Sequence, residues 1–316
     1  MSKEHSEPVK VLVTGGAGFI GSHLTVELLG MGYQVCVVDD LSTGSLDNLK
    51  QVSSNPALEV HCFSVNDLDL LLKACKGVRY IFHQAAIPSV PRSISDPLST
   101  NHANVNGTLS VLVAARDAGV KKVVYASSSS VYGDTPTLPK VEEMAPNPLS
   151  PYAVSKLAGE YYCAAFTASY GLATTSLRYF NVYGPRQAAD SAYAAVIPRF
   201  ISLIKNGKPP QIFGDGCQSR DFTFVKDVVR ANILAAQSPE TGAYNIGSGI
   251  SISLNELCSQ MLKMMGRTDI TPVYASLRPG DVLHSLAEIS RAKIAFGYNP
   301  LYSLEQGLKA TIEDYE

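Results

Sequence analysis

A tyrosine and a lysine four residues apart are the side chains in this sequence best suited to acid–base chemistry. They occur in the segment SPYAVSK at residues 150–156, where Pro151 is well placed to open a helix. In a helix this spacing puts Tyr152 and Lys156 on one face. A free phenol titrates at about pH 10, and a neighbouring ammonium favours the phenolate and brings proton transfer toward neutral pH. A hydroxyl from the serine run at residues 127–130 could complete the site.

The tyrosine–lysine pair also arises by chance in helices, so its meaning depends on a cofactor site elsewhere. A short apolar run at residues 11–13 is followed by TGGAGFIG at residues 14–21 and then by a helical pattern. Gly15, Gly18 and Gly21 allow a tight turn, let backbone N–H groups approach a pyrophosphate, and let the helix pack closely on the strand. A strand–helix connection without a ligand would have the same pattern.

A pair of acidic residues indicates which dinucleotide would bind. The strand expected at residues 34–38 ends in Asp39 and Asp40, roughly 20 residues beyond the glycine turn, where the ribose-binding acid of such sites belongs. Asp39 would accept hydrogen bonds from the ribose hydroxyls, and the two charges would repel a 2′-phosphate. The sequence therefore predicts a site for NAD, not for NADP.

Strand-like runs alternate with helical spacers along the first half of the chain. The runs lie at residues 58–65, 78–82, 122–126 and 173–177, and the spacers at 67–75, 97–118 and 151–170. This alternation predicts an α/β fold with a doubly wound parallel (Rossmann) sheet. Ligands of such sheets lie beyond the carboxyl ends of the strands, where residues 84–86 and the serine run both occur.

After residue 180 the sequence is punctuated by proline and glycine, and the strand–helix rhythm is lost. We expect residues 1–180 to form the NAD-binding domain, to which later segments are free to return. Residues 181–316 would form mainly a smaller α+β substrate lobe, with helices over 221–237 and 254–265. Arg186, Arg220 and Arg278 stand beside turns in this half, although such arginines are more often solvated surface charges than ligands.

Composition argues against several classes of partner. The 316 residues include 46% hydrophobic and 17% charged residues, and the formal net charge is −2, so there is no overall basic field to hold nucleic acid or an anionic membrane. The start of the chain lacks the apolar core of a signal peptide, and no stretch approaches the roughly 18 apolar residues of a membrane span. We therefore expect a cytoplasmic protein. Six scattered cysteines show no metal-binding spacing, and no metal site is predicted.

Six motifs give the chain a resemblance to a known family. They are TGGAGFIG at residues 14–21, QAA at 84–86, NVNG at 104–107, SSSSVYG at 127–133, SPYAVSK at 150–156 and RYFN at 178–181. From residue 11 to about residue 308 the sequence resembles the extended short-chain dehydrogenase/reductases that modify nucleotide sugars. Within that group it is most similar to UDP-hexose 4-epimerases.

The resemblance implies a role for each member of the tyrosine–lysine segment. Tyr152 would be the acid–base group, Lys156 would polarise it and bind the nicotinamide ribose, and Ser128 would contact the sugar 4-hydroxyl. The other implied cofactor contacts, beside Gly15, Gly18 and Gly21, are Phe19, Ile20, Asp39, Val65, Ala85 and Asn104. One departure is Ser64, where relatives usually place an aspartate that faces the adenine.

The resemblance also implies contacts for a UDP-sugar in the second lobe. Arg220 and Arg278 would bind the pyrophosphate, for which the planar guanidinium fork is well suited. The remaining implied substrate residues are Asn181 at a phosphate oxygen, Val196 and Phe213 at the uracil, and Asp281 at the uridine ribose. Ala195 departs from the asparagine of better-studied relatives.

Ser129 and Ser130 bear on which reaction the chain catalyses, because the fold hosts several. In the family, 4,6-dehydratases carry Asp-Glu at these positions and decarboxylases tend to keep the glutamate. What remains is oxidation and re-reduction at C4: Tyr152 removes the 4-hydroxyl proton, hydride passes to NAD, and its return to the other face of a 4-keto sugar inverts the carbon. A UDP-glucuronate 4-epimerase or decarboxylase and a non-catalytic dinucleotide sensor are the alternatives, although a sensor has no reason to keep the catalytic residues.

A small residue at position 285 bears on substrate size. In the family, a bulky aromatic at this position accompanies restriction to plain hexoses, and a small residue accompanies acceptance of N-acetylhexosamines. Ser285 leaves room for the acetamido group, and the sequence is most similar to UDP-N-acetylglucosamine 4-epimerases. UDP-glucose and UDP-galactose are the alternative substrates, because Ser285 could face elsewhere and because Pro88 replaces the glycine that those enzymes tend to have.

The resemblance finally implies a quaternary structure. Relatives pair through two helices that correspond here to about residues 101–118 and 151–170. We therefore expect a homodimer that binds NAD and a UDP-sugar and has no nucleic-acid or membrane partner.

Overall fold

A seven-stranded parallel sheet forms the centre of the computed structural model, which describes residues 8–188, 195–276 and 282–315. Its strands are β1 (Lys10–Thr14), β2 (Gln34–Asp39), β3 (Leu58–Cys62), β4 (Tyr80–His83), β5 (Lys122–Ser128), β6 (Ala173–Tyr179) and β11 (Gly242–Ile246). Their order is β11-β6-β5-β4-β1-β2-β3, and every neighbouring pair is parallel. The chain reverses direction across the sheet between β1 and β4, where doubly wound sheets bind ligands. The predicted fold class is confirmed.

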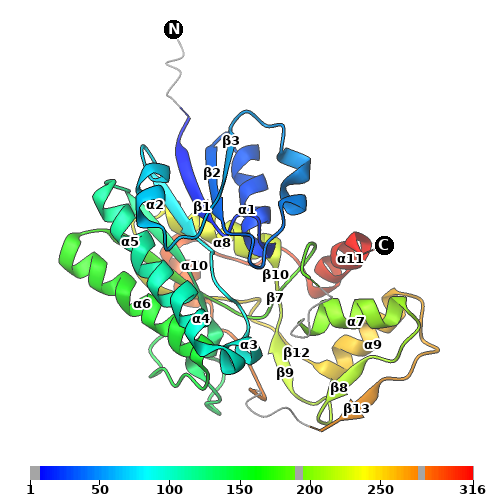
Figure 1. Cartoon of the computed structure of the whole chain (residues 1–316). Helices are drawn as coiled ribbons and strands as arrows, with labels where there is room; N and C mark the ends of the chain where they lie inside the picture. Colours follow the sequence, from blue (N-terminus) through cyan, green and yellow to red (C-terminus); the bar gives the residue numbers. More distant parts are fainter. Residues whose placement is uncertain (1–7, 189–194, 277–281, 316) are drawn as a thin grey trace.

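Helices cover both faces of this sheet (Figure 1). One face carries α1 (Phe19–Gly30), α8 (Val225–Gln237) and α10 (Ser290–Phe296), and the other carries α2 (Leu68–Ala74), α5 (Gly107–Asp117) and α6 (Pro151–Tyr170). Because side chains alternate along a strand, Val11 and Val13 pack toward α1 while Leu12 packs toward α2 and α5. Short elements complete this half: η1 (Leu46–Val52), α3 (Val90–Ser95), α4 (Pro97–Asn101), the π-helical turn η2 (His102–Asn106) and η3 (Ser129–Tyr132).

A smaller lobe with its own core lies beside the sheet (Figure 1). Its helices are α7 (Val196–Lys205), α9 (Leu254–Met264) and α11 (Leu304–Asp314). Three strand pairs accompany them: β7 (Val182–Tyr183) with β10 (Thr223–Phe224), β9 (Ser219–Asp221) with β12 (Ser251–Ser253), and β8 (Gln211–Phe213) with β13 (Val273–Ala275). Phe200, Met261 and Leu308, one from each helix, are fully buried in the shared apolar core. No helix within the described ranges is long and apolar enough to cross a membrane.

Two element boundaries and one sequence pattern differ from expectation. The helix expected over residues 221–237 begins at Val225, because Asp221 ends strand β9 and its buried carboxylate accepts hydrogen bonds from the backbone N–H groups of Ser248, Gly249 and Ala287. Strand β3 ends at Cys62 and not at residue 65. The strand–helix rhythm also continues past residue 180, since β6, α8 and β11 add a further parallel step to the sheet. A domain boundary at residue 180 stays a prediction.

Candidate active site

The glycine turn after β1 leaves no space for side chains. Gly15 has φ +69°, and a Cβ there would lie 2.6 Å from the backbone nitrogen of Ala85, in the loop after β4. A Cβ on Gly21 would lie 2.0 Å from the Gly15 carbonyl oxygen. No side chain caps the N-terminus of α1 at Gly18, and the first N–H groups of a helix need acceptors from outside it. This cradle between β1 and β4 fits the pyrophosphate of a dinucleotide.

Asp39 lies at the end of β2 against the same turn. Its side chain is buried, and its two oxygens accept hydrogen bonds from the backbone N–H groups of Ala17 and Leu41, both at 2.9 Å. Burial raises the pKa of Asp39, and the neighbouring Asp40 acts in the same direction. Each carboxylate oxygen can accept a further hydrogen bond, so the group fits contact with ribose hydroxyls.

The loop that follows β4 is fixed from two sides. The backbone N–H of Ala85 donates to the Thr14 hydroxyl (3.4 Å). Asn104, in the π-helical turn, is buried: its amide accepts from Ile87 N (2.8 Å) and donates to the Ser155 hydroxyl (2.9 Å). Asn104 therefore ties this loop to α6, and its predicted contact with the cofactor is not tested by this structure.

The remaining predicted cofactor residues lie on other segments of the same domain. Phe19 and Ile20 open α1, and Val65 is buried beyond the end of β3. Ser64, at the position where relatives place an aspartate, accepts a hydrogen bond from the backbone N–H of Asn66 (3.3 Å). The roles of these residues in cofactor binding stay predictions.

Tyr152, Lys156 and Ser128 come together as the sequence predicts. Helix α6 begins at Pro151, so Tyr152 and Lys156 lie one turn apart. The Lys156 ammonium is 5.9 Å from the centroid of the Tyr152 ring and donates to the carbonyl oxygen of Ala126 (2.8 Å). The Ser128 side chain, at the end of β5, lies close enough to the Tyr152 hydroxyl to lower its pKa. Phenol, ammonium and serine hydroxyl thus form one constellation at the carboxyl edge of the sheet.

The acid–base properties of the constellation differ from the expectation in one respect. Burial raises the pKa of Tyr152 and the Ser128 side chain acts in the opposite direction, whereas we expected Lys156 to lower it. Burial also lowers the pKa of Lys156 to about 8. The Lys156 ammonium donates its hydrogen bond to the Ala126 carbonyl oxygen.

A cleft in the second lobe is lined by four of the eight predicted substrate residues. Among its lining side chains are Asn181, Val196, Phe213 and Arg220. Asn181 has the unusual φ of +28°, and its side-chain amide donates to the Ser285 hydroxyl (3.1 Å). Arg220 donates to the Leu283 carbonyl oxygen (2.9 Å). The predicted residues Arg278 and Asp281 lie outside the described residues.

Arg199 also lines this cleft and was not predicted from the sequence. The guanidinium of Arg199 lies 5.5 Å from the centroid of the Phe213 ring and donates to the Gln211 side chain (2.7 Å). The missed signal is helical spacing, because Arg199 follows Val196 by three residues in α7 and so shares its face. Arg186, which the sequence analysis singled out, is not among the cleft residues and donates instead to the Ser22 hydroxyl of α1 (3.3 Å).

One group of metal-ligand types also escaped the sequence analysis, which predicted no metal site. Cys36 on β2 and Glu59 and His61 on β3 offer ligand atoms within 4.8 Å of one another. They meet because the two strands pair Cys36 with Glu59 in register. The Glu59 carboxylate also forms an ion pair with Lys10 (3.4 Å) and lies 2.9 Å from His61 Nε2.

Comparison with known proteins agrees with this geometry. Residues 11–247 match the model of the NAD dependent epimerase/dehydratase family. The chain belongs to this family. The match, together with the glycine cradle, confirms the prediction of NAD as cofactor and the predicted resemblance to nucleotide-sugar epimerases.

Three relatives define the group more closely. A UDP-glucose 4-epimerase from Mycolicibacterium smegmatis is 40% identical over 96% of this chain and 98% of its own length. The solved UDP-N-acetylglucosamine 4-epimerase from Methanobrevibacter ruminantium M1, bound to UDP-N-acetylmuramic acid, is 41% identical with a TM-score of 0.94, over 98% of this chain and 99% of its own. A UDP-glucuronic acid 4-epimerase variant from Bacillus cereus, solved with NAD, is 33% identical with a TM-score of 0.90, over 97% and 98%. The chain is an enzyme of the UDP-sugar 4-epimerase group.

Gly21→Ala should reduce both bound NAD and stability. The new methyl group would lie 2.0 Å from the Gly15 carbonyl oxygen, and the shift needed to relieve such overpacking costs about 1–3 kcal/mol or more. Gly30→Ala is the matched control in the same helix, because a Cβ there meets nothing within 4 Å. NAD released per chain and the melting temperature report the effect. Full NAD content in Gly21→Ala would contradict the claim that the glycine cradle binds the cofactor.

Proposed function

We propose that this enzyme inverts C4 of UDP-sugars through a transient 4-keto sugar. The observation that carries the proposal is the constellation of Tyr152, Lys156 and Ser128 beside the glycine cradle. Ser129 and Ser130 replace the acidic pair that elimination of water would require. A non-catalytic dinucleotide sensor is disfavoured, because it would need none of these three side chains.

The reaction assigns each side chain a task. Tyr152 takes the 4-hydroxyl proton and later returns it, and the Ser128 hydroxyl orients the oxygen that loses and regains this proton. Lys156 binds the nicotinamide ribose and favours the phenolate. When NAD is bound it supplies hydride acceptance and return at C4. The positive charge of oxidised nicotinamide would also favour the phenolate.

The second-lobe cleft would hold the UDP moiety. Val196 and Phe213 would line the uracil, and Asn181 and Arg220 would contact the phosphates. The positive φ of Asn181 supports a functional role, because strained backbone tends to persist where a side chain has to be aimed. Arg199 adds a cation to the same cleft, and we include it among the phosphate- or uracil-binding candidates.

The preferred sugars would be UDP-N-acetylglucosamine and UDP-N-acetylgalactosamine. Ser285 supports this, because its small side chain is buried and lies against Asn181 of the cleft. The M. ruminantium enzyme, a UDP-N-acetylglucosamine 4-epimerase, supports it further. The M. smegmatis relative is a UDP-glucose 4-epimerase, so UDP-glucose and UDP-galactose form the second candidate pair.

We also propose a homodimer, located in the cytoplasm. Exposed apolar side chains on α6 support the dimer: Val154 is 52% and Tyr161 61% exposed, and their seven-residue spacing puts them on one stripe. Leu98 of the nearby α4 is 82% exposed. A single-chain molar mass in solution would contradict the dimer.

Tyr152→Phe should lower turnover by about 10²- to 10⁴-fold while NAD content stays unchanged, because only the proton-transferring hydroxyl is lost. The assay incubates pure protein with UDP-glucose, UDP-galactose and their N-acetylated counterparts and measures the C4 epimer of each. Tyr170→Phe, at the exposed far end of the same helix, is the control and should turn over normally. Near wild-type turnover in Tyr152→Phe would refute the mechanism.

Ser285→Tyr should selectively depress turnover of the N-acetylated pair. The ring would occupy the space that the acetamido group needs, and overfilling costs about 1–3 kcal/mol, or roughly 5- to 150-fold. UDP-glucose and UDP-galactose should be spared. Ser53→Tyr, at an exposed site outside the cleft, controls for the added ring. Equal loss for both pairs, or loss for neither, would show that Ser285 does not select for size.

A further inference from the structure

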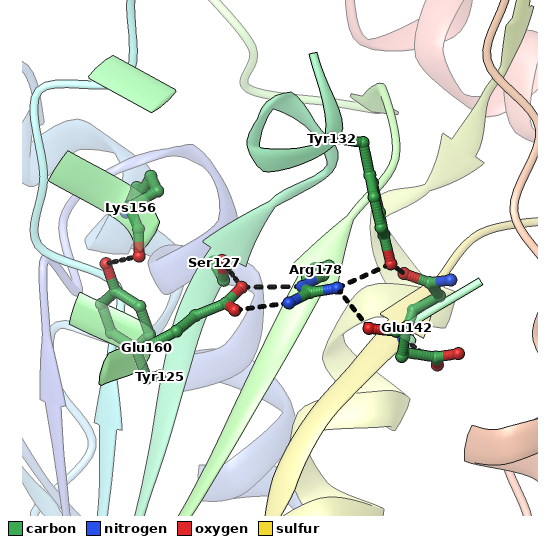
Figure 2. A network of polar contacts seen from close by, with 8 residues as sticks. Tyr125, Ser127, Tyr132, Glu142, Lys156, Glu160 and Arg178 are labelled. Atoms are coloured by element: carbon green, nitrogen blue, oxygen red, sulfur yellow. Dashed lines mark hydrogen bonds and ion pairs between the residues drawn. The ribbon is translucent and has the colours of Figure 1, made fainter. Parts of the chain in front are cut away.

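A buried ion pair joins Glu160 of helix α6 to Arg178 of strand β6, next to the strand that carries Ser128. Glu160 lies on α6 one turn beyond Lys156, and its carboxylate accepts hydrogen bonds from the Ser127 hydroxyl (2.5 Å) and from Arg178 Nε and Nη2 (2.9 and 2.7 Å). Arg178 lies on β6 directly opposite Ser127 of β5. Figure 2 shows the guanidinium between Glu160 on one side and Tyr132 on the other.

The Arg178 guanidinium also contacts the segment that follows Ser128. Arg178 Nη1 donates to the Tyr132 hydroxyl (2.8 Å) and to the Glu142 carbonyl oxygen (3.3 Å). Tyr132 ends the short helix η3, which begins at Ser129. The segment from Ser127 to Tyr132 is thus held on both sides of Ser128, and one of its partners is on the helix of Tyr152 (Figure 2).

Stability alone is a weak explanation for this pair. Both side chains are only 6% exposed, and burying two charges costs about as much as their attraction returns, so apolar replacements are often neutral or stabilising. The pair also balances charge beside the site. With Arg178 bound, the Glu160 carboxylate is compensated, and Lys156 one turn away donates to the Ala126 carbonyl oxygen instead.

We propose that Arg178 and Glu160 are positioning residues that set the contact between Ser128 and Tyr152. This inference rests on the proposed function, in which those two hydroxyls act on one sugar oxygen. Neither Arg178 nor Glu160 needs to touch substrate or cofactor. They act by fixing strand β5, helix η3 and helix α6 relative to one another at the carboxyl edge of the sheet.

Arg178→Lys is the direct test, because lysine keeps the charge but cannot contact Glu160 in two places and Tyr132 at once. Misplacement by about 1 Å can cost 10²-fold, so we expect kcat to fall about 10- to 100-fold while KM and bound NAD stay within about twofold. Arg267→Lys is the control, since Arg267 forms a similar two-bond pair with Asp269 on the surface (3.0 and 3.1 Å). Parental kcat in Arg178→Lys would overturn the proposal.

The double variant Arg178→Met/Glu160→Leu separates positioning from stability. It removes both charges together, so we expect a melting temperature near or above that of the parent. Turnover should nevertheless stay low, because the link from α6 to Ser127 and Tyr132 is gone. A double variant with parental stability and parental kcat would overturn the proposal, and if it fails to fold Arg178→Lys still decides the question.

A structural measurement keeps this inference separate from the proposed function. Crystal structures of the parent and of Arg178→Lys, both with NAD, would show whether the Ser128 and Tyr152 hydroxyls move apart. Their separation supports the positioning role and an unchanged distance overturns it, whichever reaction the enzyme catalyses. Absence of C4 epimerisation by the parent would refute the proposed function alone.

Discussion

The close approach of the β1 turn to the loop after β4 is the constraint on which the site depends. Backbone atoms meet at Gly15 with no room for a side chain, and this contact places the N-terminus of α1 at the point where the strand order reverses. The ends of the two strands are joined by His83, which is fully buried and hydrogen-bonded to Thr14 (2.7 Å) and Thr108 (3.0 Å). Burial lowers the pKa of His83 to about 3, so the imidazole that links the two strands stays uncharged at neutral pH.

The catalytic residues are positioned from the same edge but by a different kind of contact. Strand β5 supplies Ser128 and helix α6 supplies Tyr152 and Lys156, and packed apolar faces alone allow such elements to slide slightly. Directional hydrogen bonds between buried charged groups do not, because they are lost within a small displacement. A buried Arg178–Glu160 pair is thus best placed where geometry matters more than net stability.

The first half of the chain was predictable because local pattern and global fold agree there. Glycine spacing, apolar runs and the proline before Tyr152 each act over a few residues. These local features were enough to predict the sheet, the glycine cradle and helix α6. Strand β11 and the start of α8 escaped prediction because long-range pairing decides them: Asp221 is held by backbone groups some 27 to 66 residues away. Arg199 is a different case, because its three-residue spacing from Val196 can be seen in the sequence and only its position over Phe213 depends on the folded α7.

The choice of reaction and of substrate depends on a few side chains, whereas the fold depends on packing throughout the chain. Epimerases that act on different UDP-sugars share most of this architecture, with TM-scores of 0.90 and above. The packing of the sheet therefore does not determine which UDP-sugar is bound. In the proposed reaction, Ser129 and Ser130 in place of the acidic pair would leave Tyr152 as the principal proton-transfer group, which suits a cycle without net redox change. The proposed limit on substrate size lies at Ser285, whose hydroxyl accepts a hydrogen bond from Asn181. Specificity could then change at one residue without any change in the fold.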